Sequence, residues 1–324
     1  MAITLKAADD DAGRRLDRIL RRALPEFPLS RLHRLLREGR ILVDGRPGEA
    51  AERIRPGASI EIPGSGEGGP TRGTPPSPVP PDPAPKAGSL DILREAGGLL
   101  FLNKPPGLPV HGPESLESRV RAYLAGKLPP SLSFRPGPLH RLDKPTSGII
   151  AFSTSLEGAR YFSALLRERK VKKRYLALAE GNLDRPGVWE DFLLRDRGDK
   201  KTFPAADPGK GQKARTRVYP LLARGDYSLI MAEIETGRTH QIRAQGAIHG
   251  FPLAGDRKYG RAPLEGGFLL HACAMEFQEP GDPAPLALWA PPPERFRRII
   301  EELFPEIAKN PGRISFKALF HAIL

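Results

Sequence analysis

The chain has 324 residues, enough for two folded domains, and 39% of them are hydrophobic, so a sizeable core can form. Its 51 Lys and Arg outnumber its 38 Asp and Glu, and the resulting net charge of +13 suits a polyanionic partner. One cysteine excludes an intrachain disulfide, and no segment resembles a signal peptide or a bilayer span, so we expect a cytoplasmic protein without a membrane partner.

Residues 1–63 have the pattern of a small domain made of two helices and a β-ribbon. Ser30 is the predicted N-cap of the second helix, and Gly39 is predicted to end it. The turn Asp44-Gly45 follows the first of two predicted strands. The apolar helix positions are Leu16, Ile19, Leu20, Leu32, Leu35 and Leu36, and the predicted strands cover residues 41–43 and 59–62.

This small domain resembles the alpha-L RNA-binding motif, the type first seen in ribosomal protein S-four. The matching segments are Arg15-Leu16-Asp17, Ser30-Arg31 and residues 39–45. Arginines recur on successive turns of both predicted helices, and a planar guanidinium binds phosphate with two hydrogen bonds. The alternative is a basic surface that is only solvated. The resemblance implies that the RNA-binding residues include Arg15, Arg18, Arg31 and Arg34.

Residues 64–88 contain eight prolines and six glycines and almost no large apolar side chains. Such a segment cannot bury enough surface to offset its ordering entropy, so we predict a semi-extended linker. It precedes a larger domain at residues 89–308. The final segment, residues 309–324, is basic and partly amphipathic, and we predict an appendage with no assigned task.

The larger domain mixes strand-like runs with helices in an order that does not repeat, which favours an α+β fold over a doubly wound one. The strongest predicted helix covers Leu156 to Glu168, with Tyr161, Leu165 and Leu166 as its apolar positions and Gly158 as a weak point. No glycine-rich phosphate loop, dinucleotide fingerprint or zinc-ligand spacing occurs, so we expect no cofactor and no metal. The predicted strands include residues 99–102, 175–179, 228–234 and 269–275.

Asp143 stands in a basic loop, between Arg141 and Lys144, and is followed by Pro145 and Gly148. A carboxylate on a loop that a rigid strand supports is well placed for catalysis. In an arbitrary protein, an aspartate in such a loop more often caps it or forms a salt bridge. The residues around this loop therefore decide between the two interpretations.

The segments around Asp143 resemble the RluA-type pseudouridine synthases, specifically the branch that modifies large-subunit ribosomal RNA. Five segments match in order and together cover most of residues 99–273. The resemblance implies a catalytic domain with a mainly antiparallel mixed sheet and flanking helices, acting without a cofactor on large-subunit ribosomal RNA or its precursor. The matching segments are Leu102–Gly107 with Val110-His111, His140–Gly148, Lys173–Ala177, Thr236–Arg243, and Gly255–Gly260 with Leu270–Ala272.

The resemblance assigns catalytic roles to three residues that lie far apart in the sequence. Asp143 is the catalytic carboxylate, which attacks the ribose, attacks the uracil or removes a ribose proton; these alternatives stay open. Tyr175 stacks on the uracil ring and is a candidate for proton abstraction. Arg243 pairs with the aspartate. The resemblance also implies that Arg141 fills or braces the space that the extruded nucleotide leaves.

Lys104, Arg238 and His240 lie in the same matching segments, and we expect them to bind RNA. The chain departs from the family pattern at Ala244-Gln245, where Val-His is usual, and at Ser153-Thr154, where Ala-Lys is usual. No segment is typical of a dimer face, so we expect a monomer. The competing hypotheses are a non-catalytic RNA-binding or ribosome-assembly protein, and a metal-dependent hydrolase, for which ligands are lacking.

Overall fold

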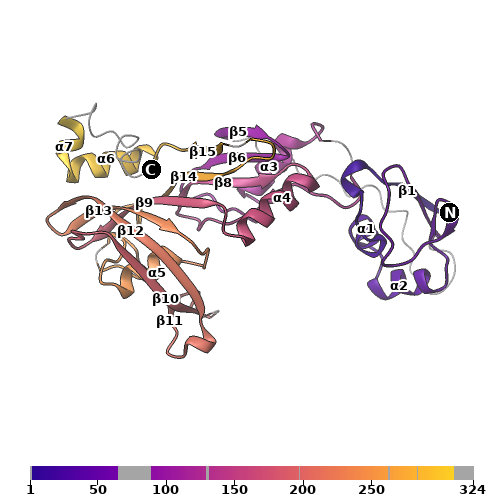
Figure 1. Cartoon of the computed structure of the whole chain (residues 1–324), viewed down its shortest axis with the longest axis horizontal. Coiled ribbons are helices and arrows are strands. Elements are labelled where there is room, and N and C mark those ends of the chain that lie inside the picture. The colour runs from indigo at the N-terminus through magenta and orange to yellow at the C-terminus, as the bar shows by residue number, and fades with distance from the viewer. Residues whose placement is uncertain are drawn as a thin grey trace.

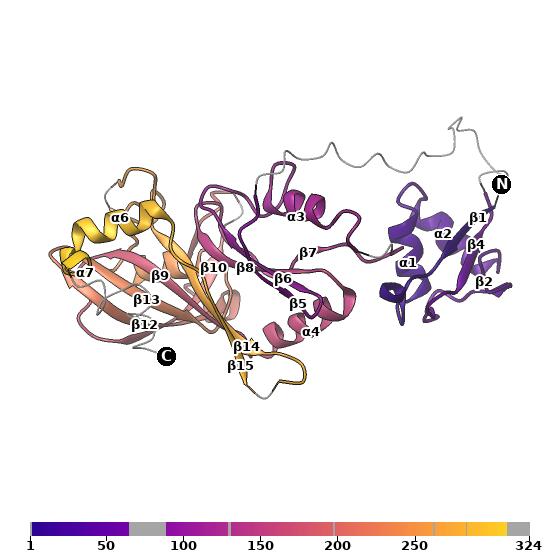
Figure 2. The same ribbon diagram turned by 90° about the horizontal axis from the view of Figure 1, so that it is seen from above.

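The computed structural model describes residues 2–64, 89–128, 131–196, 198–261, 263–282 and 284–309. The predicted linker, apart from Gly64, and the predicted appendage, apart from Lys309, lie outside the described residues. Within those residues, no helix is long and apolar enough to cross a membrane. Figures 1 and 2 show a small N-terminal unit at one end of the molecule and a larger unit that holds the remaining elements.

The N-terminal unit is a four-stranded sheet, in the order β1-β4-β2-β3, packed against two helices. All six apolar helix positions predicted from the sequence are buried. The predicted turn at Asp44-Gly45 is confirmed, because both residues have positive φ, 49° and 80°. The elements are β1 (Ile3–Lys6), η1 (Asp9–Asp11), α1 (Leu16–Ala23), α2 (Leu29–Arg37), β2 (Leu42–Val43), β3 (Arg46–Pro47) and β4 (Ser59–Ile62).

The predicted N-cap of the second helix is wrong. Helix α2 begins at Leu29, one residue before Ser30, and its N-cap position is occupied by Pro28, which provides no side-chain hydrogen bond. The proline ring holds φ at −56°, and this rigid backbone sets the start of the helix in place of a serine cap. The predicted end is confirmed by Gly39, which has a φ of 64° and follows the C-cap.

The larger unit is built on an eleven-stranded mixed sheet, counted over the described residues. Its main order is β11-β10-β12-β13-β9-β14-β8-β6-β5, with β15 paired to β14 and β7 to β8. Every strand pair is antiparallel except β8–β14, so the predicted mainly antiparallel mixed sheet is confirmed. The strands are β5 (Ile92–Ala96), β6 (Leu99–Lys104), β7 (Gly137–Pro138), β8 (Ser147–Ser153), β9 (Lys172–Glu180), β10 (Gly187–Arg195), β11 (Thr202–Pro204), β12 (Gln212–Arg224), β13 (Tyr227–Ile234), β14 (Leu270–Gln278) and β15 (Pro285–Trp289).

Helices flank this sheet, and one of them packs unusually closely. The predicted helix at residues 156–168 is confirmed as α4, but the deeply buried side chains are Phe162 and Leu165. Gly158, predicted as a weak point, is a requirement of packing, because a Cβ there would lie 2.3 Å from the carbonyl oxygen of Gly98. The helices are α3 (Leu116–Leu124), α4 (Leu156–Arg167), α5 (Gln241–Ile248), α6 (Glu294–Leu303) and α7 (Pro305–Lys309), with a short 3-10 turn η2 (Pro208–Lys210).

The parallel contact between β8 and β14 positions the loop that carries Asp143. It joins Ser147 and Gly148 to His271 and Ala272. Gly148 has a φ of 108°, and a Cβ at this position would lie 2.2 Å from the carbonyl oxygen of Ala272. Only glycine satisfies both conditions, so the start of β8 lies directly against β14.

Candidate active site

The Asp143 loop runs between β7 and β8 and is held by hydrogen bonds on both sides. The backbone N–H of Thr146 donates to the carbonyl oxygen of Asp143 at 3.0 Å, which closes a turn around the carboxylate. From β6, the Nζ atom of Lys104 donates to the carbonyl oxygens of Lys144 at 3.1 Å, Leu108 at 2.8 Å and Pro105 at 2.9 Å. The lysine therefore joins two loops that are about forty residues apart in the sequence.

The prediction that Lys104 binds RNA is wrong in this structure. Its side chain is 0% exposed, and burial lowers its pKa to about 8, while the charge of Asp143 acts in the opposite direction. Three carbonyl oxygens already accept from its ammonium group. Lys104 supports the Asp143 loop from beneath and does not present its charge to a phosphate.

Arg243, on α5, lies between two carboxylates. Its Nη1 atom donates to Oδ2 of Asp143 at 3.1 Å. Its Nε and Nη2 atoms donate to the two carboxylate oxygens of Asp256 at 2.6 and 2.9 Å. The guanidinium also lies 4.4 Å from the ring centre of Phe268 and 5.1 Å from that of Tyr259. Every direction of this side chain is constrained, so Arg243 can fix the orientation of Asp143.

The environment of Arg243 favours its charged form. Burial alone would lower its pKa, but the hydrogen bonds and charge of Asp256, followed by those of Asp143, raise it above the ordinary value. The side chain of Asp256 is 0% exposed and that of Asp143 is 17% exposed. Arg243 therefore forms a buried ion pair on one side and a solvent-accessible one on the other.

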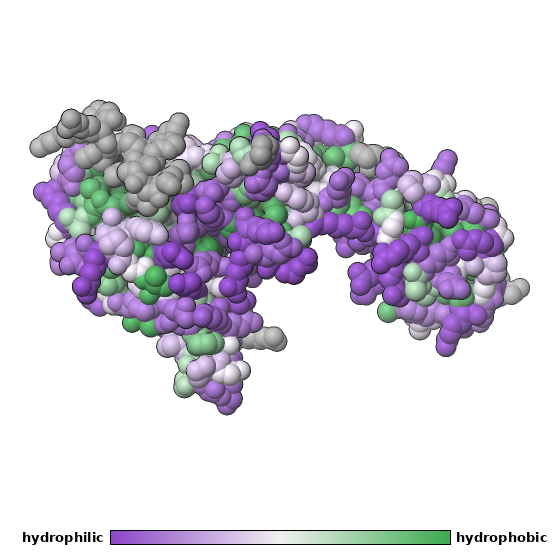
Figure 3. Space-filling model, viewed as in Figure 1, coloured by the Kyte–Doolittle hydropathy of each residue, from purple (hydrophilic) through white to green (hydrophobic). Residues whose placement is uncertain are grey.

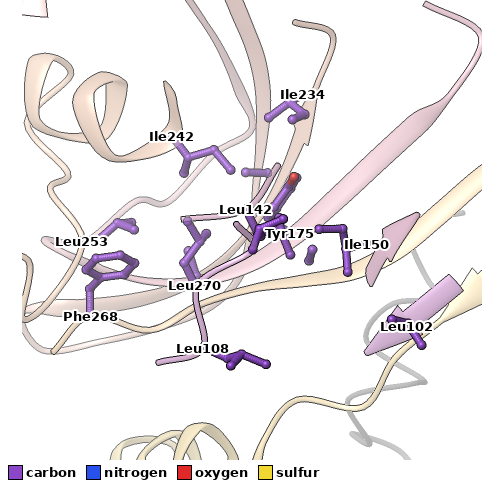
Figure 4. Close-up of a cluster of buried hydrophobic side chains, with 14 of the residues drawn as sticks. Leu102, Leu108, Leu142, Ile150, Tyr175, Ile234, Ile242, Leu253, Phe268 and Leu270 are labelled. Carbon is purple, nitrogen blue, oxygen red and sulfur yellow. The ribbon is translucent and has the colours of Figure 1, made fainter. Parts of the chain in front are cut away.

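Tyr175, on β9, forms part of the apolar wall beside Asp143. Figure 4 shows it next to Leu142, with its hydroxyl end directed toward Ile234. Burial raises its pKa, and the negative charge of Asp143 raises it further, so the hydroxyl is protonated at neutral pH. The ring is only 6% exposed. The part of the ring that is accessible lines the same pocket as Asp143.

His240 precedes α5 with a φ of 55°, a conformation that few non-glycine residues adopt. The backbone N–H of Thr202, on β11, donates to the Tyr259 hydroxyl oxygen at 2.7 Å. That hydroxyl lies 2.9 Å from Nδ1 of His240. Burial is the main cause that lowers the pKa of His240, to about 4, so the ring is neutral at pH 7.

The two neighbours of His240 lead us to predict which of its nitrogens carries the proton. The Tyr259 oxygen accepts from Thr202, and its hydroxyl hydrogen can be donated to Nδ1. The carboxylate of Asp143, whose Oδ2 lies 3.6 Å from Nε2, can only accept, which favours a hydrogen on Nε2. We therefore predict that Nδ1 accepts from Tyr259 and that Nε2 carries the hydrogen of the neutral ring. In that form, Asp143 has an N–H group on one side and a guanidinium on the other.

Asp143 lies in a pocket of about 190 Å³. Of the residues singled out from the sequence, the pocket brings together Asp143, Tyr175, Arg243, Arg141, Arg238 and His240. Arg141 is exposed two residues before Asp143, and Nε of Arg238 donates to the carbonyl oxygen of Lys213 at 3.0 Å. The pocket therefore combines an apolar wall with a concentration of positive charge around one carboxylate.

The four arginines predicted to bind RNA on the N-terminal unit are outside this pocket. Arg15 makes a bidentate pair with Asp17, and Arg31 lies 4.4 Å over the ring of Phe27. Arg18 and Arg34 are exposed. Their role in RNA binding stays a prediction.

Sequence reasoning missed several residues that shape the site. Asp256 and Tyr259 lie in the matching segment Gly255–Gly260, so a signal was present, but no local pattern indicated their roles. Lys173, also in a matching segment, lines the pocket, as does Thr146, whose buried hydroxyl has no hydrogen-bond partner among the described residues.

Two other features of the sequence have structural roles. Gln245 stands where the family pattern usually has histidine. Its Oε1 atom accepts from Thr216 Oγ1 at 2.7 Å, and its Nε2 atom donates to Asp191 Oδ2 at 2.7 Å, so it connects α5 to β12 and β10. Cys273 is buried on β14, and burial raises its pKa to about 12. Within the described ranges, no group of three His, Cys, Asp or Glu side chains is arranged to hold a metal ion.

Comparison with known proteins agrees with this geometry. The profile of the family "RNA pseudouridylate synthase" matches residues 98–247. The chain is 31% identical to the ribosomal large subunit pseudouridine synthase D of Neisseria meningitidis serogroup A, over 90% of this chain and 79% of the relative. It is 30% identical to the ribosomal large subunit pseudouridine synthase C of Escherichia coli K12, over 91% of this chain and 94% of the relative.

A solved structure supports the fold. The human protein "RNA Pseudouridylate Synthase Domain Containing 4" is similar to this chain with a TM-score of 0.55 and 24% sequence identity, over 65% of this chain and 92% of that one. At this identity the likeness shows the fold alone. The family profile and the two ribosomal large subunit enzymes that the chain resembles lead to one conclusion: the chain belongs to the RNA pseudouridylate synthase family and is an isomerase that acts on RNA.

Proposed function

We propose that the chain converts specific uridines of large-subunit ribosomal RNA, or of its precursor, to pseudouridine, and that Asp143 is the catalytic carboxylate. The observation that carries this proposal is the position of Asp143 in a pocket that Tyr175 also lines, with the Asp143 carboxylate 3.1 Å from the Arg243 guanidinium. A pure RNA-binding protein gains nothing from an acid at the centre of a basic pocket, because the acid repels phosphate.

The reaction is an isomerisation within one nucleotide. The bond between the ribose C1′ and the uracil N1 breaks, and a bond between C1′ and the uracil C5 forms. The hydrogen on C5 is lost, and N1 gains one, so the reaction balances without an oxidant or a reductant. Asp143 acts as nucleophile or base, and both roles need an ionised carboxylate in a fixed orientation, which Arg243 provides through its contact with Asp256.

The pocket also provides groups that bind the base. The target uridine must leave its stack, which costs a few kcal/mol. Stacking on the ring of Tyr175 offsets part of that cost. Because its hydroxyl is protonated, Tyr175 meets the base as a neutral phenol and not as an anion. Arg141, exposed at the pocket, is placed to enter the space from which the nucleotide came.

The test is the substitution Asp143→Asn, which removes the charge and keeps the shape. We expect it to abolish pseudouridine formation in a large-subunit ribosomal RNA transcript, while RNA affinity stays within about 3-fold of the unmodified chain, a change under 1 kcal/mol. The exposed Asp184→Asn is the matched control and should keep full activity. Full activity in the Asp143 variant would refute the assignment.

The activity of the parent chain in the same experiment distinguishes the proposed enzyme from a non-catalytic RNA-binding protein. A non-catalytic RNA-binding protein would bind the transcript tightly and form no pseudouridine even with Asp143 in place. Mapping of pseudouridines in ribosomal RNA from cells with and without the gene then identifies the modified positions. Absence of any difference between the two maps would contradict the ribosomal substrate.

A further inference from the structure

A buried carboxylate joins the N-terminal unit to the larger unit. Asp11, in η1, is fully buried and accepts five hydrogen bonds. Ala8 provides one of them from within the N-terminal unit, at 3.0 Å. The other four come from a segment of the larger unit: Ser131 Oγ at 2.9 Å, Leu132 N at 2.9 Å, Ser133 N at 2.9 Å and Ser133 Oγ at 2.5 Å. We call this contact between Asp11 and residues 131–133 the Asp11 clasp.

Neighbouring residues extend the clasp in both directions. Asp10 Oδ1 accepts from the backbone N–H of Leu156 at 2.9 Å, so an acid of the N-terminal unit caps the first turn of α4. Arg14 Nη1 donates to Ser133 Oγ at 3.0 Å. The side chain of Leu132 packs against the hydrophobic core of the N-terminal unit. The contact therefore has charged, polar and apolar parts.

The clasp resists separation of the two units because its groups are buried together. Burial alone would raise the pKa of Asp11, but the hydrogen bonds from Ser133, Ala8, Leu132 and Ser131 outweigh it and lower the pKa. Both oxygens of the Asp11 carboxylate accept hydrogen bonds from donors in fixed positions, so the side chain has one preferred orientation. Moving the units apart would break four of its five hydrogen bonds at once.

The docked arrangement also brings arginines from the two units together. The backbone N–H of Leu156 donates to Asp10, and Arg160 lies one helical turn further along α4. Arg14, two residues before α1, donates to Ser133 of the larger unit. In agreement with this geometry, burial and the charges of Arg160, Arg22 and Arg18 lower the pKa of Arg14, and the charge of Asp11 opposes them. The side chains of Arg18, Arg22 and Arg160 are exposed. Mutual repulsion of these cations is unfavourable in the free protein, and a bound polyanion relieves it.

We propose that the Asp11 clasp holds the N-terminal unit in a fixed position, and that Arg18, Arg22 and Arg160 form one surface across the junction that binds the phosphates of the substrate RNA. This inference rests on the proposed function for the identity of the partner. Figure 3 shows hydrophilic residues on both sides of the junction, and the N-terminal unit and the β10–β11 region project to the same side with a hollow between them.

The fixed position is tested without RNA. Cys273 is the only cysteine and is buried, so spin labels on Glu26→Cys and Arg185→Cys, both exposed, report the separation of the two units. We expect one narrow distance distribution in the full chain, at least a twofold broadening in Asp11→Ala, and no change in Asp9→Ala, the exposed control. A broad distribution with Asp11 intact would overturn the clasp, whatever the enzyme's activity.

The shared surface is tested by binding in the Asp143→Asn background, which removes catalysis from the measurement. We expect Arg160→Gln to weaken the affinity for a large-subunit ribosomal RNA fragment several-fold and to reduce the slope of log K against log salt by about 0.7–0.9, the value for one phosphate contact. Arg167→Gln, an exposed arginine on the same helix, is the matched control and should leave the slope unchanged.

The two tests fail in different ways. The junction surface would be refuted if Arg160→Gln left the salt slope unchanged while neutralisation of pocket residues still reduced it. That outcome would leave the proposed function intact. No binding of the parent chain to any ribosomal RNA fragment would refute the proposed function itself. A narrow distance distribution together with the reduced slope supports both parts of the inference.

Discussion

Arg243 holds two carboxylates of unequal exposure, and this asymmetry defines the site. The pair with Asp256 is buried and bidentate, whereas Asp143 contacts a single guanidinium nitrogen and stays open to the pocket. Lys258 adds a backbone N–H to Asp256 at 3.0 Å. Asp256 therefore acts as a positioning residue, because it orients the arginine that orients Asp143 and itself contacts no reacting atom.

Asp256→Asn should reveal this positioning role. The asparagine amide presents an N–H group to Arg243 where the carboxylate presented an oxygen, so the arginine shifts. We expect kcat to fall about 100-fold, as for small misplacements of a catalytic group, with a nearly unchanged KM. The free energy of unfolding should fall by about 3 kcal/mol because a buried ion pair is broken. Single-turnover kinetics measure the first effect and denaturant unfolding the second; unaltered kcat would contradict the role.

His240 should lose its fixed tautomer when the Tyr259 hydroxyl is removed. Tyr259→Phe deletes the donor to Nδ1, so both neutral forms of the ring become accessible. We expect kcat to fall about 5-fold, the equivalent of one net hydrogen bond of about 1 kcal/mol. Nitrogen NMR of labelled histidine should show the Nδ1 and Nε2 shifts of His240 moving toward each other.

The control for this experiment is Tyr123→Phe. The Tyr123 hydroxyl donates to Glu95 at 2.8 Å on the surface, away from the pocket, so its removal tests the loss of a tyrosine hydroxyl in general. Both kcat and the His240 shifts should stay as in the parent chain. Identical shifts in the Tyr259 variant would show that Tyr259 does not determine the tautomer.

At the scale of elements, the site depends on one parallel junction in an otherwise antiparallel sheet. Strand β8 begins immediately after the Asp143 loop and lies against β14, while β9, which carries Tyr175, lies on the other side of β14. Helix α5, which carries Arg243, packs against β10 and β11. Elements distant in the sequence therefore meet at the pocket because the sheet order places them there.

Gly148→Ala should damage this junction. The added Cβ would meet the backbone of Ala272 at 2.2 Å, and the residue would keep an unfavourable positive φ. We expect the free energy of unfolding to fall by about 2–4 kcal/mol and activity to fall with it. Gly137→Ala, where a Cβ meets nothing within 4 Å, is the matched control and should change stability by less than about 1 kcal/mol. Equal effects of the two substitutions would contradict this account.

At the scale of the whole molecule, one buried histidine, His271, and two partly buried ones, His140 and His240, make the fold sensitive to acid. Burial is the main cause that lowers the pKa from 6.5 to about 3 for His140 and to about 4 for His240 and His271. Between these values and 6.5, the unfolded chain binds protons that the folded chain does not. The stability that they contribute is therefore complete above pH 6.5 and is lost as the pH falls toward the folded-state values.

We expect the free energy of unfolding to decrease as the pH falls from 6.5 to 5, with a slope that approaches about 1.4 kcal/mol per pH unit for each of these histidines near pH 5. His271→Gln should reduce that slope by the contribution of one histidine, because it removes one of the three groups. Denaturant unfolding at several pH values measures both slopes. A free energy of unfolding that is constant over this range would contradict the neutral state of the three rings in the folded protein.

The sequence by itself determined the features that depend on neighbouring residues. The buried face of α1, the Asp44-Gly45 turn and the α4 helix follow from local periodicity and turn chemistry, and the structure confirms them. The motifs around Asp143, Tyr175 and Arg243 were also recognisable, since each is a short contiguous segment, and the structure places the three residues in one pocket. Their chemical roles remain the proposal made above.

Only the tertiary structure decided the features that depend on distant segments. Lys104 is a charged residue in a motif, and its burial under two loops follows from the packing of β6, which no local pattern reports. No local pattern indicates that Asp256 supports Arg243 or that Asp11 joins the two units. In both cases the partners are separated along the chain and meet only in the folded protein. A charged side chain has the same local sequence whether it faces solvent or a buried partner, so its role is determined by the fold around it.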